Sequence, residues 1–291
     1  MTLHAEPAIP MPRAEGSSIE YRTKSNHRLQ CFRMNSLNVT AGRIKLLGMS
    51  VHTVGMRELV GYCEQAISQR RSLVLGMVNV AKLVSSRKDR RLHESVASAD
   101  LIVADGQGVV WLSRLAGKPL PERVAGIDVM QALMDLADRK NYRVFFLGAR
   151  PAVVRQVVQK AETLYRGLKV AGYRDGYFDL ENEGQDVARQ IAASDADILF
   201  VAITPPKKEL FMDRWKDMMD VPVCHGVGGS FDVFAGRTRR APRWMQQAGL
   251  EWLYRVIQEP HRMWKRYLVT NTIFLILSLR EIITTRLRLP K

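Results

Sequence analysis

The chain has 291 residues, 46% of them hydrophobic, and its 44 Lys and Arg outnumber 29 Asp and Glu to give a net charge of +15. This length is enough to bury a substantial core, and the positive charge favours anionic partners, namely nucleic acid, an anionic membrane or phosphorylated small molecules. The 3 cysteines lie far apart without metal-ligand spacing, which argues against a disulfide framework or a cysteine metal site.

The first 40 residues are polar and rich in Ser, Pro and Arg, and they lack the apolar core of a signal peptide. We therefore expect residues 1–44 to form a flexible leader that precedes the folded part.

Continuous apolar runs then alternate with segments of helical spacing. The predicted strands cover 72–79, 100–105, 142–149, 168–173, 197–203 and 221–229, and the predicted helices cover 81–99, 108–117, 126–140, 151–165 and 207–219. Strands that are apolar throughout and separated by helices are typical of a parallel sheet with both faces covered. The sequence predicts an α/β core over residues 45–235.

The last segment, 236–291, carries 12 basic against 3 acidic residues, interleaved with Trp and Tyr. This pattern predicts a basic helical appendage that lies on an anionic membrane surface, with nucleic-acid binding as the rival. The most apolar run, 267–279, is shorter than a spanning helix needs and is interrupted by Thr and Asn.

The carboxyl ends of parallel strands are where α/β proteins bind ligands. The predicted strand ends carry Asn79, Asp105, Gly148, Thr204 and the pair Gly228 and Gly229. Asp105 has no cation beside it in the sequence and is followed by Gly106, which suits a general base near a ligand. The alternative for both Asp105 and Asn79 is that each caps the following helix.

Two further strand ends suggest an anion. The cluster at 226–231 matches a dinucleotide-binding fingerprint only in part, so a nicotinamide oxidoreductase is the weaker alternative. Lys207 and Lys208 lie near a helix N-terminus, against the helix dipole, which favours a bound anion there. Asp195 and Asp197 precede a strand and are interpreted as a solvated loop, and His225 is interpreted as strand packing.

Seven motifs in order resemble the WecG/TagA/CpsF family of bacterial glycosyltransferases, family 26 of that class. They are VNVAKL (78–83), ADLIVADGQGVVW (99–111), ERVAGIDVM (122–130), FFLGARP (145–151), PPKKELF (205–211), GVGGSFDVFAGRTRRAP (226–242) and GLEWLYRVIQEPHRMWKRYL (249–268).

The resemblance implies a Rossmann-like fold and an inverting transfer of a sugar from a UDP-sugar to a polyprenyl-diphosphate-linked saccharide. The reaction would take place at the cytoplasmic face of the membrane, with the enzyme bound peripherally and with no metal or other cofactor. The pathway implied is the synthesis of a cell-surface polysaccharide or exopolysaccharide. No nucleic-acid partner is expected, and the oligomeric state is left open.

The resemblance also implies roles for individual residues. Asp105 matches the proposed base, and Arg255, Arg262 and Arg266 match basic positions that bind the membrane or the acceptor diphosphate. The predicted substrate-binding set is Asn79, Gly106, Arg123, Gly148, Thr204, Lys208, Glu209, Gly228, Gly229 and Asp232.

The chain departs from the family pattern at two of these positions, where Thr204 replaces Gly and Lys208 replaces Gln. If the family Gln touches the donor, Lys208 is expected to pair directly with a phosphate, and the identity of the donor sugar is left open.

Overall fold

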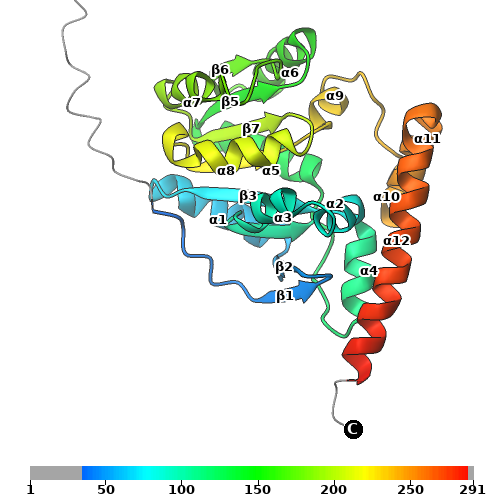
Figure 1. The fold of residues 1–291 in the computed structure, drawn as a ribbon. Coiled ribbons are helices and arrows are strands. Elements are labelled where there is room, and N and C mark those ends of the chain that lie inside the picture. Colours follow the sequence, from blue (N-terminus) through cyan, green and yellow to red (C-terminus); the bar gives the residue numbers. More distant parts are fainter. Residues whose placement is uncertain (1–34, 288–291) are drawn as a thin grey trace, which may run out of the picture. The chain divides into compact units, whose positions relative to one another are not determined.

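The computed structural model describes residues 35–287, with backbone only at 262, 263, 266 and 285–287 (Figure 1). Most of the predicted leader, residues 1–34, lies outside the described residues. Residues 35–44 do not form a separate leader: Leu37 is buried, and its N–H donates to the carbonyl of Ser72 at 2.8 Å. The first strand begins at Arg43, so the predicted boundary at residue 44 is too late.

A six-stranded parallel sheet forms the centre of the fold, as the sequence predicts, in the order β4-β3-β8-β7-β5-β6. Its strands are β3 (Leu73–Val78), β4 (Leu101–Ala104), β5 (Arg143–Gly148), β6 (Lys169–Arg174), β7 (Ile198–Ala202) and β8 (Val223–Gly226). Residues of β3, β4, β7 and β8 are buried throughout, which explains their uninterrupted apolar runs.

Helices cover both faces of this sheet because alternate side chains along each strand point to opposite sides. Leu73, Leu75 and Met77 of β3 pack in one cluster, whereas Val74 packs in another. The first cluster holds α1 (Met56–Ser68), α5 (Gly126–Lys140), α6 (Pro151–Leu164) and α9 (Ser230–Phe234); the second holds α7 (Gly184–Ala193) and α8 (Lys207–Met219). The predicted Rossmann-like α/β architecture is confirmed.

A third apolar cluster lies beside β4. It contains a hairpin that the sequence analysis did not predict, β1 (Arg43–Leu46) and β2 (Met49–His52), which turns through Leu47 and Gly48 with positive φ angles of 48° and 90°. The same cluster holds α2 (Val80–Ser86), α3 (Arg90–Ala97) and α4 (Gln107–Leu115).

The single helix predicted over 81–99 is wrong, because α2 and α3 are separate. The chain breaks at Asp89, whose side chain accepts a hydrogen bond from the Leu92 N–H at 3.0 Å and so caps a new helix.

The C-terminal segment is helical as predicted, with α10 (Arg243–Gln247), α11 (Glu251–Gln258) and α12 (Pro260–Leu287). Helix α12 packs along α2 and α11, and its Phe274 is buried in the third cluster (Figure 1). The expectation that no segment is long enough to span a membrane is wrong by length and composition, since the 18 residues Tyr267–Thr284 meet that test and only 11% of them are buried.

Candidate active site

Asp105 follows β4 directly, at the carboxyl edge of the sheet. Its N–H donates to the Val78 carbonyl at 2.8 Å, which extends the pairing of β3 with β4 to the acid itself. Its Oδ1 accepts a hydrogen bond of 2.8 Å from the N–H of Gly126, the first residue of α5. The carboxylate therefore lies at the positive end of a 15-residue helix, where an anion is favoured.

The surroundings of Asp105 pull its pKa in opposite directions. Removal from water raises the pKa of Asp105 above its ordinary value and dominates, while the Gly126 N–H and the positive charges of Lys82 and Arg255 oppose this rise. The sequence shows no cation beside this acid, but the fold brings two near it, from α2 and α11. A carboxyl group with a raised pKa at the edge of a sheet suits proton transfer.

Asn79 and Gly106 end neighbouring strands and lie together. Asn79 caps α2, since its side chain accepts from the Lys82 N–H at 3.0 Å, so the capping alternative is what the structure shows for it. Gly106 precedes α4, and a Cβ added there would lie 3.4 Å from the Cβ of Asn79. Helices α2 and α4 thus start side by side next to Asp105.

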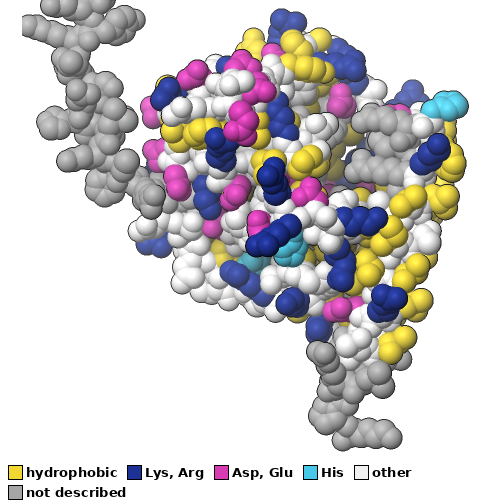
Figure 2. Space-filling model, in the orientation of Figure 1, with side chains coloured by type: hydrophobic (Ala, Val, Ile, Leu, Met, Phe, Trp, Pro, Cys, Tyr) yellow, Lys and Arg dark blue, Asp and Glu magenta, His cyan; other side chains and the backbone are white. Residues whose placement is uncertain are grey.

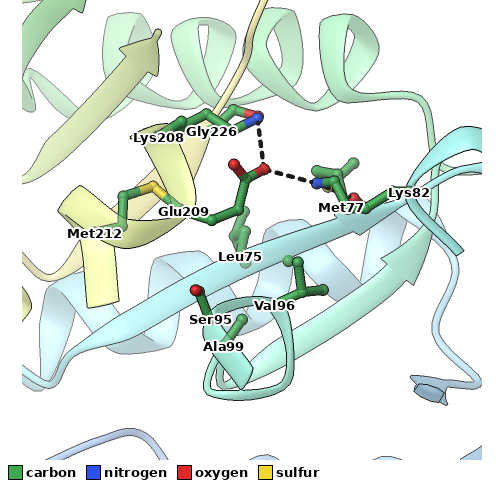
Figure 3. Close-up of a pocket in the computed structure, with 11 residues that line it drawn as sticks. Leu75, Met77, Lys82, Ser95, Val96, Ala99, Lys208, Glu209, Met212 and Gly226 are labelled. Carbon is green, nitrogen blue, oxygen red and sulfur yellow. Dashed lines mark hydrogen bonds and ion pairs between the residues drawn. The ribbon is translucent and has the colours of Figure 1, made fainter. Parts of the chain in front are cut away.

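A buried charge cluster lies beneath this edge (Figure 3). The carboxylate of Glu209, in the first turn of α8, lies between Lys82 Nζ at 3.0 Å and Lys208 Nζ at 3.4 Å. Lys82 Nζ also donates to the carbonyl of Met77 at 2.6 Å, near the end of β3. The cluster joins α2, α8 and the central strands by charge-assisted contacts.

Burial and the charge of Lys82 lower the pKa of Lys208 to about 8, with Glu209 opposing the change. Burial by itself would raise the pKa of Glu209, but Lys82 and Lys208 outweigh it and the pKa of Glu209 is lowered. The adjoining cavity has a volume of about 10 Å³, which is room for roughly one water molecule.

Lys208 is predicted from the sequence to meet a phosphate, but in this structure it meets a carboxylate. Its exposed fraction is 6%, and its amine is turned toward Glu209 and the carbonyl of Gly226. Gly226 is required for this arrangement, because a Cβ there would lie 2.8 Å from carbons of the Lys208 side chain.

The remaining glycines of the set differ in what surrounds them. Gly228 has a φ of +53°, and Cβ atoms added at Gly228 or Gly229 would meet nothing within 4 Å, so this backbone after β8 is open to a ligand. Gly148 instead faces the backbone of Ala202, where a Cβ would lie only 2.5 Å away. Strand β5 is also four positions from β4, about 19 Å at usual strand spacing, so the fold does not bring Gly148 to Asp105.

Thr204 and Asp232 lie on elements next to the open glycines. Thr204 is exposed just after β7, the strand next to β8, and Asp232 is half-buried in α9, which follows Gly229. Both lie at the carboxyl edge of the sheet, as the sequence predicts.

His225 is linked to Asp105 through Gly126, which both residues contact. It is fully buried on β8, and its Nε2 lies 2.9 Å from the carbonyl oxygen of Gly126. Burial lowers the pKa of His225 to about 4, with the nearby lysines adding to the effect, so the ring is neutral at pH 7 and donates through Nε2. Gly126 is held through its N–H by Asp105 and through its carbonyl by His225, so this histidine positions the acid indirectly.

A second set of charges joins the core to the appendage. We call it the clasp: Arg123, Asp128, Arg240 and Glu251. Arg240 binds both carboxylate oxygens of Asp128, at 2.5 and 2.8 Å, and its Nε lies 3.7 Å from Glu251. Arg123 pairs with Glu251 at short range and lies 3.9 Å from Asp128.

The sequence predicts that Arg123 binds substrate, and the structure shows it paired with carboxylates of the clasp. Its side chain is 14% exposed and is already paired with carboxylates, next to the start of α5 where Gly126 meets Asp105. A bidentate, partly buried network of this kind is worth more than isolated surface pairs, because each charge left alone would be poorly solvated.

The clasp also explains how Arg255 comes near the acid. Glu251 and Arg255 lie four residues apart on α11, so they share one face of that helix. With Glu251 held by Arg123, the charge of Arg255 reaches Asp105 and lowers its pKa. The side chains of Arg262 and Arg266, predicted to act with Arg255, lie outside the described residues.

Sequence reasoning missed Lys82, Gly126, Glu251 and Arg240 as members of this site. Lys82 and Gly126 lie inside two motifs that resemble the family, VNVAKL and ERVAGIDVM. The motifs indicated that these segments belong to the site, but not which residues Lys82 and Gly126 contact. Glu251 carried a weak signal as one of 3 acids in a strongly basic tail.

Replacing Arg240 with Gln is expected to loosen α11 without unfolding the core. Loss of a charge-assisted, bidentate pair costs about 1.5–3 kcal/mol, so amide hydrogen exchange across 251–258 should accelerate by about tenfold or more. Arg239→Gln is the matched control, since that side chain is exposed. Equal exchange in both variants would show that the clasp does not hold the appendage.

The chain is similar to known proteins over most of its length. Residues 44–288 match the family described as "Glycosyl transferase WecG/TagA/CpsF family". The chain is 39% identical over 214 residues to the N-acetylglucosaminyldiphosphoundecaprenol N-acetyl-beta-D-mannosaminyltransferase of Bacillus subtilis (strain 168), covering 73% of this chain and 82% of that protein. It is 42% identical over 178 residues to the protein of the same name from Bacillus spizizenii, covering 61% and 68% respectively. A family model that matches most of the chain shows that this chain is a glycosyltransferase of the WecG/TagA/CpsF family.

Proposed function

We propose that this protein transfers a sugar, with inversion, from a UDP-sugar to a polyprenyl-diphosphate-linked saccharide at the membrane surface. The observation that supports this most is the position of Asp105: a carboxylate with a raised pKa, at the carboxyl edge of the sheet, approached by the charge of the appendage residue Arg255. The names of the two Bacillus relatives support an undecaprenyl-diphosphate-linked amino sugar as the class of acceptor.

The chemistry follows from the needs of glycosyl transfer. A sugar hydroxyl is a poor nucleophile, so a base must take its proton as the oxygen attacks the anomeric carbon. Asp105 has this role in the proposal, with Gly126 and His225 fixing its orientation. A single direct displacement inverts the anomeric centre.

The departing UDP gains negative charge, which side-chain cations and backbone N–H groups stabilise. The open backbone at Gly228 and Gly229 is the proposed place for the donor. It follows β8, which pairs with β3, and β3 pairs in turn with β4, the strand that precedes Asp105. Arg255 is the proposed partner of a diphosphate beside Asp105. Lys208 contributes indirectly, by joining the start of α8 to the end of β8 through the carbonyl of Gly226.

The acceptor lipid gives the appendage its role. Large apolar side chains are exposed along α12, and Figure 2 shows hydrophobic side chains along the edge of the molecule formed by α11 and α12. We define the apolar face of α12 as Leu268, Val269, Leu275, Ile276, Leu279 and Ile283, all at least 50% exposed. Trp264, Lys265 and Arg280 are exposed on the same helix, as is usual where a helix meets an anionic bilayer surface.

The packing of α12 favours a helix that lies on the membrane over one that crosses it. The opposite side of the helix contacts the core through Phe274, with Ile273 and Leu277 partly buried beside it. To cross a bilayer, α12 would have to leave these contacts and α2. A surface position instead brings Asp105 to the lipid-borne acceptor.

Asp105→Asn is expected to lower turnover by at least about 100-fold while leaving the fold intact, because Asn cannot accept the proton. The measurement is sugar transfer to a polyprenyl-diphosphate acceptor, with circular dichroism to confirm folding. Asp135→Asn, an exposed acid on α5, is the control and should retain full activity. Near-normal turnover of the Asp105 variant would remove it from the role of base.

Changing Leu275, Ile276 and Leu279 together to Gln is expected to weaken binding to anionic vesicles by more than about tenfold. Burial of each such side chain contributes about 1.5–3 kcal/mol, and the three are exposed in the protein alone. Co-sedimentation with vesicles measures the effect. A control pair, Leu164→Gln and Tyr177→Gln, removes exposed apolar groups elsewhere and should bind normally. Unchanged binding of the triple variant would contradict the proposed membrane face.

A further inference from the structure

A second cavity lies near the start of β4, between the β1–β2 hairpin and α3, whereas Asp105 follows the end of β4. It has a volume of about 160 Å³, well above the roughly 10–15 Å³ that one water needs. The hairpin of β1 and β2, helix α3 and the first half of β4 border it, and it opens to solvent at exposed residues such as Arg43 and Ser50. Its lining consists of Arg43, Gly48, Met49, Ser50, His52, His93, Ala97, Ala99 and Ile102, none of which belongs to the candidate active site.

His52 is the buried polar group of this lining, with an exposed fraction of 2%. The N–H of Ile102 donates to its Nδ1 at 2.9 Å, so the neutral ring carries its hydrogen on Nε2. Nε2 is buried and has no hydrogen-bond partner among the described residues.

Arg43 supplies the charge. It is the cross-strand partner of His52 in the hairpin, so the two side chains share a face, and the guanidinium contributes to the lowered pKa of His52 after burial itself. Within residues 35–287 the structure shows no ion pair for Arg43. Ser50 and His93 add a hydroxyl and a second imidazole to the lining, which contains no carboxylate.

We propose that this cavity binds a small oxyanion of the size of phosphate, held by the Arg43 guanidinium, with the Ser50 hydroxyl and the His93 imidazole completing the shell and the buried ring of His52 forming part of the wall. The lining offers hydrogen-bond donors and a positive charge, and no group that would favour a cation. The volume admits a tetrahedral anion with some of its water. This site is independent of the proposed transfer reaction.

Inorganic phosphate is the probe that tests the site, added to the full-length protein at constant ionic strength while the histidine ring signals are followed by NMR. The expected result is a saturable shift of the His52 and His93 signals. Arg43→Gln, a change at an exposed residue, should weaken the apparent affinity by about tenfold, since one charge-assisted hydrogen bond is worth about 1.5–3 kcal/mol.

Arg155→Gln, an exposed arginine on α6, is the control and should leave the phosphate affinity unchanged. Sulfate is expected to compete with phosphate, and chloride is not. A shift that rises without saturation, that chloride reproduces, or that Arg43→Gln leaves intact would overturn the proposal, because each outcome indicates only general attraction of anions to a basic protein.

Discussion

The contact between Glu251 and Arg123 is the interaction on which the site depends. The two residues are 128 positions apart in the sequence, and their pairing fixes α11 against the start of α5. Arg240 and Asp128 complete the clasp with a bidentate contact. Because α5 also supplies the Gly126 N–H to Asp105, the same helix start orients the acid and holds the appendage. The appendage in this way borders the candidate active site.

Two kinds of charged group lie around Asp105: buried groups that pair with one another, and an exposed arginine on α11. Lys82, Lys208 and Glu209 are nearly or fully enclosed, and they compensate one another within the ends of α2, α8 and β8. Such a cluster is costly to bury, so its value lies in fixing geometry more than in stabilising the fold. Arg255, by contrast, is exposed on α11 and faces the acid with a charge that a diphosphate can share. The exposed apolar face of α12 belongs to the same appendage as Arg255.

Much of the framework could be predicted from the sequence, because buried parallel strands leave long apolar runs. Such runs located β3, β4, β7 and β8 and placed Asn79 and Asp105 at one edge. The hairpin of β1 and β2 was missed because its strands have only 4 residues each. The break between α2 and α3 was missed because a single capping residue, Asp89, ends a pattern that otherwise continues.

The partners within the site were not predictable, because they are contacts between distant segments. Nothing in the local sequence of Lys208 shows that Lys82 and the carbonyl of Gly226 lie beside it, and a lysine near a helix N-terminus equally suits a phosphate. Gly148 was misleading for a similar reason: its glycine serves the close approach of the Ala202 backbone, not an approach to a ligand near Asp105.

The pKa of Asp105 in solution reports whether α11 lies over the site as described. Carbon-13 NMR of the aspartate carboxyl groups can follow it in the wild type and in Arg255→Gln, with Arg280→Gln as a control on the same appendage. A nearby positive charge stabilises the carboxylate, so its removal raises the pKa. We expect the Asp105 pKa to rise in Arg255→Gln and to stay unchanged in Arg280→Gln. An unchanged pKa in Arg255→Gln would contradict the placement of the appendage at the active site.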